Sequence, residues 1–480
     1  MRAQRLRTIQ RGPAVAALAL LLPSCGASGS AGGSGASASV IDAGSDAPAA
    51  ADDNGSPSST YPAFAADMPQ VRANQGTVLK APILVTITWP SVDPNVSIWE
   101  AFGDGIGSST FWNDTTSEYG IGLATSGAPN HVRMSDSLPP SMTYYEVQDY
   151  VVAALGGTLP DGGASEGGIG AVDGGGAGAN GSLWPAPTSE DGNIQTIYSL
   201  FIPASTSVTD PGSGQSFCDE GGSGYHDSVV VGGRPVAYAV TLECPSQPVA
   251  SSEETASHEY VEATTNPYPT SASLGYVGFD ADHLSWDLYT GYNDELADAC
   301  QNWADSYIQQ AAPFPYWVQR IWSNARALAG HDPCAPELAG PYRGMTLFPS
   351  EEASISVDLT SIGMSKTTTR GFAAKVGQTV TFGVGFYSDA PTDGSWTIAY
   401  DFPQSLLLFD AMGQPVKNGA ATVQIDQTAG ENGEIAQVSV TPTAAGELGF
   451  QVMAITWSPP PALVAATYQP HYAPLVVSNE

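Results

Sequence analysis

The residues from Ser257 to Pro267 carry the most specific chemical pattern in the chain. They read Ser-His-Glu-Tyr-Val-Glu-Ala-Thr-Thr-Asn-Pro, so His258 and Glu262 stand four positions apart and Glu259 follows the histidine. On a helix, positions i and i+4 share a face, so one metal ion can contact both side chains. The spacing is that of the zinc-binding H-E-x-x-H helix, with Glu262 in place of the second histidine. Zinc accepts a carboxylate oxygen, so the pattern predicts a zinc site.

Chance gives this pattern rarely. With six histidines in the chain and about one residue in 25 being Glu, about 0.01 copies are expected. The alternative is a solvated acidic helix face, because Glu253 and Glu254 precede the motif and runs of charge usually face water. The motif by itself leaves both interpretations open.

A third ligand must come from another element. A second helix is predicted over Asp294–Gln310, where Glu295 and Asp298 at i and i+3 can face back toward His258. This arrangement resembles that of the gluzincins, in which a Glu from the following helix completes the zinc site. The resemblance implies that Glu295 is the third ligand and that Asp298 hydrogen-bonds the ligand histidine. The alternative is that both acids favour the helix N-terminus through its dipole.

The resemblance extends over about residues 75 to 343. The motif, the Glu295-x-x-Asp298-x-Cys300 segment and residues 318–324 resemble secreted bacterial proteins with a zincin-like motif. Upstream, Phe217-Cys218, Gly224-Tyr225-His226 and Cys244-Pro245 are similar to the phosphate-induced, Exordium-like family of plants. The first resemblance implies a zinc metallopeptidase that acts on protein or peptide substrates. The second implies a noncatalytic extracellular protein that binds carbohydrate or cell-envelope polymer.

Glu259 is the expected catalytic residue if zinc is bound. It would act as the general base that takes the proton of the attacking water. His226 is a candidate for oxyanion support or for an alternative metal ligand, although a single histidine is more often structural.

Calcium is a second candidate cofactor. Oxygen-bearing side chains crowd one aromatic-rich segment, and such ligands suit calcium, although their spacing does not fit an EF-hand loop. They are Asp280, Asp282, Asp287, Asn293 and Asp294.

The motif is expected to lie in an α+β domain over residues 61–343. Apolar, β-branched runs predict strands, and they are followed by helices with no regular βαβ repeat. A glycine-rich stretch over residues 156–181 lacks core-forming side chains and is expected to be a mobile surface insertion. The predicted strands are 83–89, 194–202, 229–231 and 236–240, and the predicted helices are 97–111, 141–155 and 251–264.

The last part of the chain, residues 345–480, has a different pattern. Short apolar or alternating runs are separated by turn residues, which predicts an all-β immunoglobulin-like sandwich. The runs are 355–359, 379–384, 396–400, 406–409, 421–425, 437–440 and 448–452. A structural stalk with such a sandwich is a third hypothesis for the whole protein.

The composition excludes some partners. The chain has 480 residues, with 48 Asp plus Glu against 15 Lys plus Arg, for a formal net charge of −33. Such a chain repels phosphate backbones and anionic lipids, so we expect no nucleic-acid partner and membrane attachment only through a lipid anchor.

The N-terminus predicts export. A positive segment precedes an apolar run, Ala14–Leu22, that is too short to span a membrane permanently. The run ends at Leu22-Pro23-Ser24-Cys25-Gly26, which resembles a bacterial lipobox, so residues 1–25 are expected to be a signal peptide and Cys25 the lipidated residue. Residues 26–60 are expected to be a flexible tether, because they lack large apolar side chains. The protein would be secreted or held as a lipoprotein at the cell surface or outer membrane.

The remaining four cysteines predict two disulfides in an oxidising compartment. Three connectivities exist. We favour Cys218 with Cys244 and Cys300 with Cys334, because each pair brackets one compact segment and no C-x-x-C metal or redox spacing is present.

Overall fold

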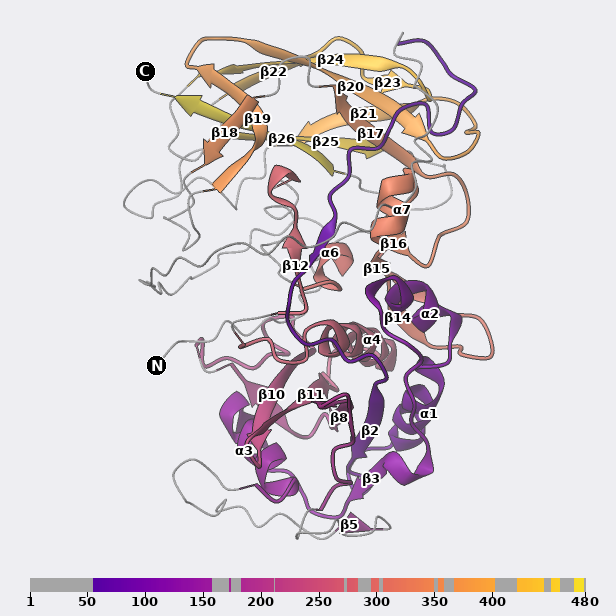
Figure 1. The fold of residues 1–480 in the computed structure, drawn as a ribbon, viewed down its shortest axis with the longest axis vertical. Helices are drawn as coiled ribbons and strands as arrows, with labels where there is room; N and C mark the ends of the chain where they lie inside the picture. The colour runs from indigo at the N-terminus through magenta and orange to yellow at the C-terminus, as the bar shows by residue number, and fades with distance from the viewer. Residues whose placement is uncertain are drawn as a thin grey trace.

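The computed structural model of the chain combines helices with a larger share of strands (Figure 1). It describes residues 55–157, 172–173, 183–210, 212–271, 274–283, 295–301, 305–348, 353–357, 367–401, 421–443, 450–457 and 470–478. The expected signal peptide with Cys25, most of the tether, and most of the glycine-rich segment lie outside these residues.

A six-stranded sheet forms the first half of the molecule, in the order β10-β11-β8-β2-β3-β5. The four inner strands run parallel, and β10 and β5 are antiparallel edge strands. Every residue of β8 is buried, which explains its continuous apolar sequence. The strands are β2 (Ile83–Thr88), β3 (His131–Met134), β5 (Val172–Asp173), β8 (Thr196–Ile202), β10 (Gly224–Val231) and β11 (Arg234–Leu242).

Helices connect the parallel strands. The sequence analysis had predicted no such regular βαβ arrangement. Parallel neighbours cannot be joined by a hairpin, so α1 (Val96–Ile106) and α2 (Thr110–Thr116) lie between β2 and β3, and α3 (Tyr144–Ala154) lies between β3 and β8. The predicted helix 97–111 is divided at Gly107, where a Cβ atom would lie 2.2 Å from the Ala124 carbonyl oxygen. Ser109 then caps α2 by accepting the Trp112 N–H.

Helix α4 (Val249–Thr265) packs against β10, β11 and β14 (Trp317–Gln319). Figure 1 shows it between the central sheet and the segment that leads to the C-terminal strands. Its residues from Ser251 to Thr265 are all buried, although many are polar. The solvated acidic face considered for this helix is therefore wrong: Glu253 and Glu254 are 8% and 5% exposed.

The predicted helix over 294–310 is also wrong in the described residues. Only one turn forms, α6 (Asp298–Gln301), and β13 (Tyr307–Gln309) pairs with β14. The Ser306 hydroxyl donates to the Cys300 carbonyl, and the Arg320 N–H donates to the Ser306 carbonyl at 2.6 Å. The long-range backbone bond from Arg320 and the pairing of β13 with β14 take the place of helical bonds, so tertiary pairing overrides local helix propensity.

Both predicted disulfides are confirmed. Cys218 joins Cys244, which follows β11, and Cys300 joins Cys334. The second bridge ties α6 to the hairpin of β15 (Ile321–Trp322) and β16 (Cys334–Ala335).

Two further sheets make up the C-terminal part, with the orders β17-β20-β24-β22 and β18-β19-β26-β25-β21-β23. Strands of the two sheets lie against each other, as in a β-sandwich (Figure 1). The predicted run at 406–409 lies outside the described residues, and β19 and β26 run parallel. The strands are β17 (Arg343–Phe348), β18 (Ala353–Val357), β19 (Thr367–Lys375), β20 (Val380–Ser388), β21 (Trp396–Asp401), β22 (Ala421–Ile425), β23 (Ala429–Gly430), β24 (Ile435–Pro442), β25 (Phe450–Trp457) and β26 (Pro470–Ser478).

The beginning of the described chain is bound to these C-terminal sheets. The Asn432 side chain donates to the carbonyls of Ser58 and Thr60 and accepts the Ala63 N–H. Ordered contacts thus begin before residue 60, where the tether was expected to end.

Shorter elements complete the connections. They are β1 (Val71–Ala73), which pairs with β12 (Tyr276–Phe279); β4 (Ser141–Thr143), which pairs with β9 (Ser207–Thr209); β6 (Ser189–Glu190), which pairs with β7 (Asn193–Ile194); α7 (Asn324–Ala329); and the 3-10 turns η1 (Ser117–Tyr119), η2 (Ala128–Asn130) and η3 (Ala281–His283).

Candidate metal centre

Helix α4 places the motif side chains inside the protein. His258 and Glu262 meet on one face as their spacing predicts, with Nε2 of His258 3.0 Å from Oε1 of Glu262. His258, Glu259 and Glu262 are each 2% exposed. The pair is therefore a buried structure and not a surface ion pair.

His226 enters the same site from the edge strand β10. Its Nδ1 lies 3.4 Å from Oε2 of Glu259 and 3.5 Å from Oε2 of Glu262. The strand can come this close to α4 because residue 224 is glycine: a Cβ atom there would lie 2.4 Å from Cγ2 of Thr255. Sequence analysis named His226 only as a secondary candidate, and the sheet topology brings it into the centre.

The segment that begins α6 supplies two further carboxylates. Oε1 of Glu295 lies 3.4 Å from Nε2 of His226, and Oδ1 of Asp298 lies 3.6 Å from Nε2 of His258. The Cys300–Cys334 bridge holds this short segment in place. We call the set His226, His258, Glu259, Glu262, Glu295 and Asp298 the metal centre.

Gln319 on β14 fixes the orientation of His258. Its side-chain amide donates to the Ala297 carbonyl at 2.7 Å, which leaves its Oε1 to accept from His258 Nδ1 at 2.9 Å. Nδ1 of His258 therefore carries a proton, and Nε2 faces Glu262 and Asp298, where its lone pair becomes available once the second proton is lost. A metal-binding histidine commonly donates its second N–H in this way.

His226 has a comparable support. Its Nε2 lies 3.1 Å from the backbone carbonyl oxygen of Asn266, just beyond the C-terminus of α4. A proton on Nε2 donates to that oxygen and leaves the lone pair of Nδ1 facing Glu259 and Glu262. Sequence analysis missed Gln319 and Asn266 as supports, although both residues lie in segments that carry the zincin-like resemblance.

Within the described residues, two groups of donor atoms lie close enough to hold a metal ion. One group is His226, Glu262 and Glu295, and the other is His258, Glu262 and Asp298; the atoms of each lie within 4.8 Å of one another. The expected set of His258, Glu262 and Glu295 is thus divided between the groups. Asp298, expected as a hydrogen-bonding neighbour, lies at a ligand position beside His258.

The electrostatics of the centre favour bound cations. Burial lowers the pKa of His258, but Glu262, with Glu259 and Asp298, outweighs burial and raises the pKa to about 10. Burial likewise lowers the pKa of His226, and Glu295, Glu259 and Glu262 raise it well above its ordinary value. Burial raises the pKa of Glu262, but the two histidines lower it overall. Carboxylates that hold protons on neighbouring histidines so firmly also attract metal ions.

Glu259 differs from its neighbours. Burial raises the pKa of its carboxyl group, and the nearby histidines only partly oppose this effect. A carboxylate with a raised pKa is suited to accept a proton near neutral pH.

The calcium candidates behave differently. Asp280 accepts the Gln70 N–H at 2.9 Å and pairs with His283 Nδ1 at 2.6 Å, so it is engaged in holding the chain together. Asp287, Asn293 and Asp294 lie outside the described residues, and Asp282 lies in η3.

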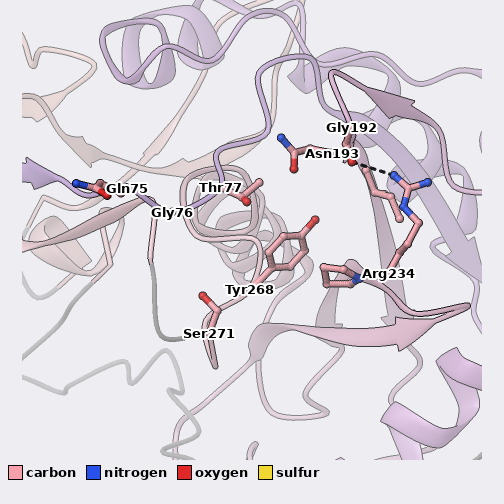
Figure 2. Close-up of a pocket in the computed structure, with 10 residues that line it drawn as sticks. Gln75, Gly76, Thr77, Gly192, Asn193, Arg234, Tyr268 and Ser271 are labelled. Atoms are coloured by element: carbon pink, nitrogen blue, oxygen red, sulfur yellow. Dashed lines mark hydrogen bonds between the residues drawn. The ribbon is translucent and has the colours of Figure 1, made fainter. Parts of the chain in front are cut away.

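A pocket of about 320 Å³ lies beyond the C-terminal end of α4. Figure 2 shows Tyr268 projecting among Thr77, Ser271 and Arg234, while Arg234 donates to the Gly192 carbonyl at 3.1 Å. Its lining has no His, Cys, Asp or Glu.

Comparisons with known proteins add little to this description. No protein-family model and no curated protein matches the chain. A solved structure of domains 4 and 5 of the S-layer protein SbsC matches 28% of this chain and 77% of its own, with 13% identity and a TM-score of 0.15. Among the described residues, none of the helices has the length and apolar character needed to cross a membrane. The two disulfides are typical of proteins of oxidising compartments.

Proposed function

We propose that the protein is an exported, zinc-dependent peptidase whose metal site includes His258, Glu262 and Asp298. The observation that carries this proposal is the convergence of these three buried side chains, with the His258 lone pair aimed at the two carboxylates by Gln319. The donor set of one imidazole nitrogen and two carboxylate oxygens fits zinc.

Zinc at this position would supply Lewis acidity toward a peptide carbonyl. Glu259 stands beside this position on the same helix, and its raised pKa suits it to take the proton of the attacking water and to pass it to the leaving amine. Gln319 keeps His258 in the tautomer that the site needs. The protein side chains thus provide both the ligands and the proton transfer of a hydrolase.

Peptide is the substrate class that the surroundings favour. β10 carries His226 and forms the edge of the central sheet, with β11 as its neighbour in the described residues. An edge strand can bind an extended peptide through backbone hydrogen bonds. The exposed end of β10, where Val230 is 66% exposed, is the part open to such a peptide, while Gly224 to Asp227 beside the metal centre are buried.

The location of the protein is part of this proposal. The signal-like N-terminus and two disulfides support export, and the lipobox-like sequence supports lipid attachment at Cys25. The metal centre would then act outside the cytoplasm.

Two substitutions on α4 test the chemistry. His258→Ala should lower the bound zinc by about one ion per chain and remove hydrolysis of unfolded protein substrates, because a ligand is lost. Glu259→Gln should keep zinc and lower hydrolysis by about 10²–10⁴-fold, because only the base is lost. Glu253→Gln is the matched control, since Glu253 lies on the same helix but accepts the Trp317 N–H away from the centre.

The measurements are metal analysis of the purified protein and the rate of cleavage of a fluorescent unfolded protein. Wild-type protein that was folded with zinc available and contains none would refute the peptidase proposal. That result would favour the noncatalytic protein that binds envelope polymer.

A further inference from the structure

The metal centre contains more donor groups than one zinc ion uses. Zinc sites in proteins are usually four-coordinate, with three protein ligands when they are catalytic. Here two imidazoles and four carboxylates converge, and all six side chains are at most 8% exposed. The excess requires a separate explanation.

The carboxylate of Glu262 faces two ways. Its Oε1 lies 3.0 Å from Nε2 of His258, and its Oε2 lies 3.5 Å from Nδ1 of His226. The two oxygens of one buried side chain therefore point at two different histidines. This is the geometry of a carboxylate that bridges two ions.

Each histidine is oriented independently. Gln319 accepts from Nδ1 of His258, and the Asn266 carbonyl lies within reach of Nε2 of His226. Both remaining ring nitrogens face Glu262. Oε1 of Glu262 is buried, and Nε2 of His258 lies 3.0 Å from it. A cation is needed at this contact, and either the second proton of His258 or a metal ion can supply it.

Each half of the centre also has its own second carboxylate. Oε1 of Glu295 lies 3.4 Å from Nε2 of His226, the ring nitrogen that also faces the Asn266 carbonyl, and Oδ1 of Asp298 lies 3.6 Å from Nε2 of His258. Two complete groups of three donors result, and Glu262 is the residue that they share.

Four carboxylates in one buried site need positive partners, and metal ions can take that role from the protons of the two histidines.

We propose that the centre binds two divalent metal ions bridged by Glu262, one held with His226 and Glu295 and the other with His258 and Asp298. The inference rests on the proposed function only in that the His258 position binds zinc. Its donor set, with one nitrogen and two or more carboxylate oxygens for each ion, suits zinc and manganese.

The first test is zinc stoichiometry. Metal-free wild-type protein is loaded with zinc alone, passed through a desalting column and analysed for metal. We expect about two zinc ions per chain for wild type and about one for either His226→Ala or His258→Ala, because each variant keeps the other position. Glu262→Gln should weaken both positions, since the bridge is lost. Glu253→Gln should still hold two.

The second test measures whether the two zinc ions are close enough to share Glu262. X-ray absorption of the zinc-loaded protein should contain a zinc–zinc scattering path at about 3.5–4 Å. Circular dichroism of each variant establishes that it is folded, and the zinc content of the folded His226→Ala protein keeps the test decisive if another variant fails to fold.

The outcomes separate the two proposals. One zinc in wild type, removed by His258→Ala, would overturn the bridged pair and leave the proposed peptidase intact. Two zinc ions without a mutual scattering path would overturn the bridge. No zinc at all would overturn both proposals.

Discussion

The metal centre and the ion pairs of Arg320 are neighbouring buried acidic clusters whose carboxylates meet different kinds of positive partner. Arg320 is fully buried and pairs with Asp305 at 3.1 Å and with Asp332. It also donates to the carbonyls of Pro336 and Cys334. In the metal centre, the ion pairs of Glu259 and Glu262 within the described residues are with His226 and His258.

The two clusters are joined by consecutive residues. Gln319 orients His258, and the next residue, Arg320, pairs with two aspartates, Asp305 and Asp332. The guanidinium gives the second cluster a permanent positive charge, because arginine keeps its charge and uses several donors at once. Histidines can release their protons, so the first cluster can exchange protons for metal ions. The comparison separates a cluster with a permanent positive partner from one whose positive partners can lose their charge.

The largest expected effect comes from removing the positive charge of Arg320, which pairs with Asp305 and Asp332. Arg320→Met should lower the free energy of unfolding by about 3–5 kcal/mol, because two buried carboxylates lose their partner. The matched control is Arg133→Met, since Arg133 pairs with Glu100 but has a side chain that is 53% exposed. That change should cost less than Arg320→Met, because solvent screens the Arg133 side chain and His131 stays 3.7 Å from Glu100.

Denaturant unfolding of the zinc-loaded proteins measures both losses. If Arg320→Met and Arg133→Met lowered the free energy of unfolding equally, burial of the arginine would not determine the cost of removing it. If Arg320→Met also removed zinc from the folded protein, the two clusters would not be independent.

The next effect is a pH dependence confined to the metal centre. Burial lowers the pKa of His258, but Glu262 and the neighbouring carboxylates raise it more, so the pKa is about 10 without metal. Its contribution to stability is therefore present below pH 6.5, the ordinary pKa, and is lost as the pH rises through about 10.

Metal-free protein should accordingly lose on the order of a few kcal/mol of stability between pH 7 and 10, and zinc should reduce the loss by replacing the protons. Zinc affinity should fall as the pH drops from 9 to 6, since protons compete for the same nitrogens. Competition titrations with a chelator at several pH values measure this trend. An affinity that is constant across the range would contradict it.

The smallest expected effect concerns Gln319, which orients His258 and precedes Arg320 in the chain. Gln319→Leu should weaken zinc binding by about 10–100-fold, because His258 loses the acceptor that sets its tautomer. Gln309→Leu is the control, because Gln309 is exposed on the adjacent strand β13. Zinc titration of both variants, with unfolding curves to compare their stability, separates positioning from folding. A Gln319→Leu protein with wild-type affinity would refute the role given to this residue.

Local patterns were predicted well from the sequence. The H-E-x-x-E spacing depends on one helix, and α4 places His258 and Glu262 together as expected. The buried strand β8 and both disulfides were also predicted, because a continuous apolar run and short cysteine separations are local features.

Features that depend on tertiary pairing were not predicted. Asp298 and Glu295 were expected to share the face of a long helix, but the β13–β14 hairpin ends that helix after one turn. The positions of His226 and Gln319 depend on which strands flank α4. No spacing in the sequence specifies those neighbours, so the division of ligands between two groups could be read only from the structure.

The contact of Asn432 with Ser58 and Thr60 has a consequence for how the molecule would face its surroundings. The chain from a lipid-bearing Cys25 would enter the fold at the C-terminal sheets, at the end of the molecule far from the central sheet (Figure 1). The segment between Cys25 and Gly55 can span at most about 100 Å. In an anchored protein the lipid-bearing chain would thus enter the fold on the side of helix α4 that faces the C-terminal sheets, with the central sheet on the other side of that helix (Figure 1).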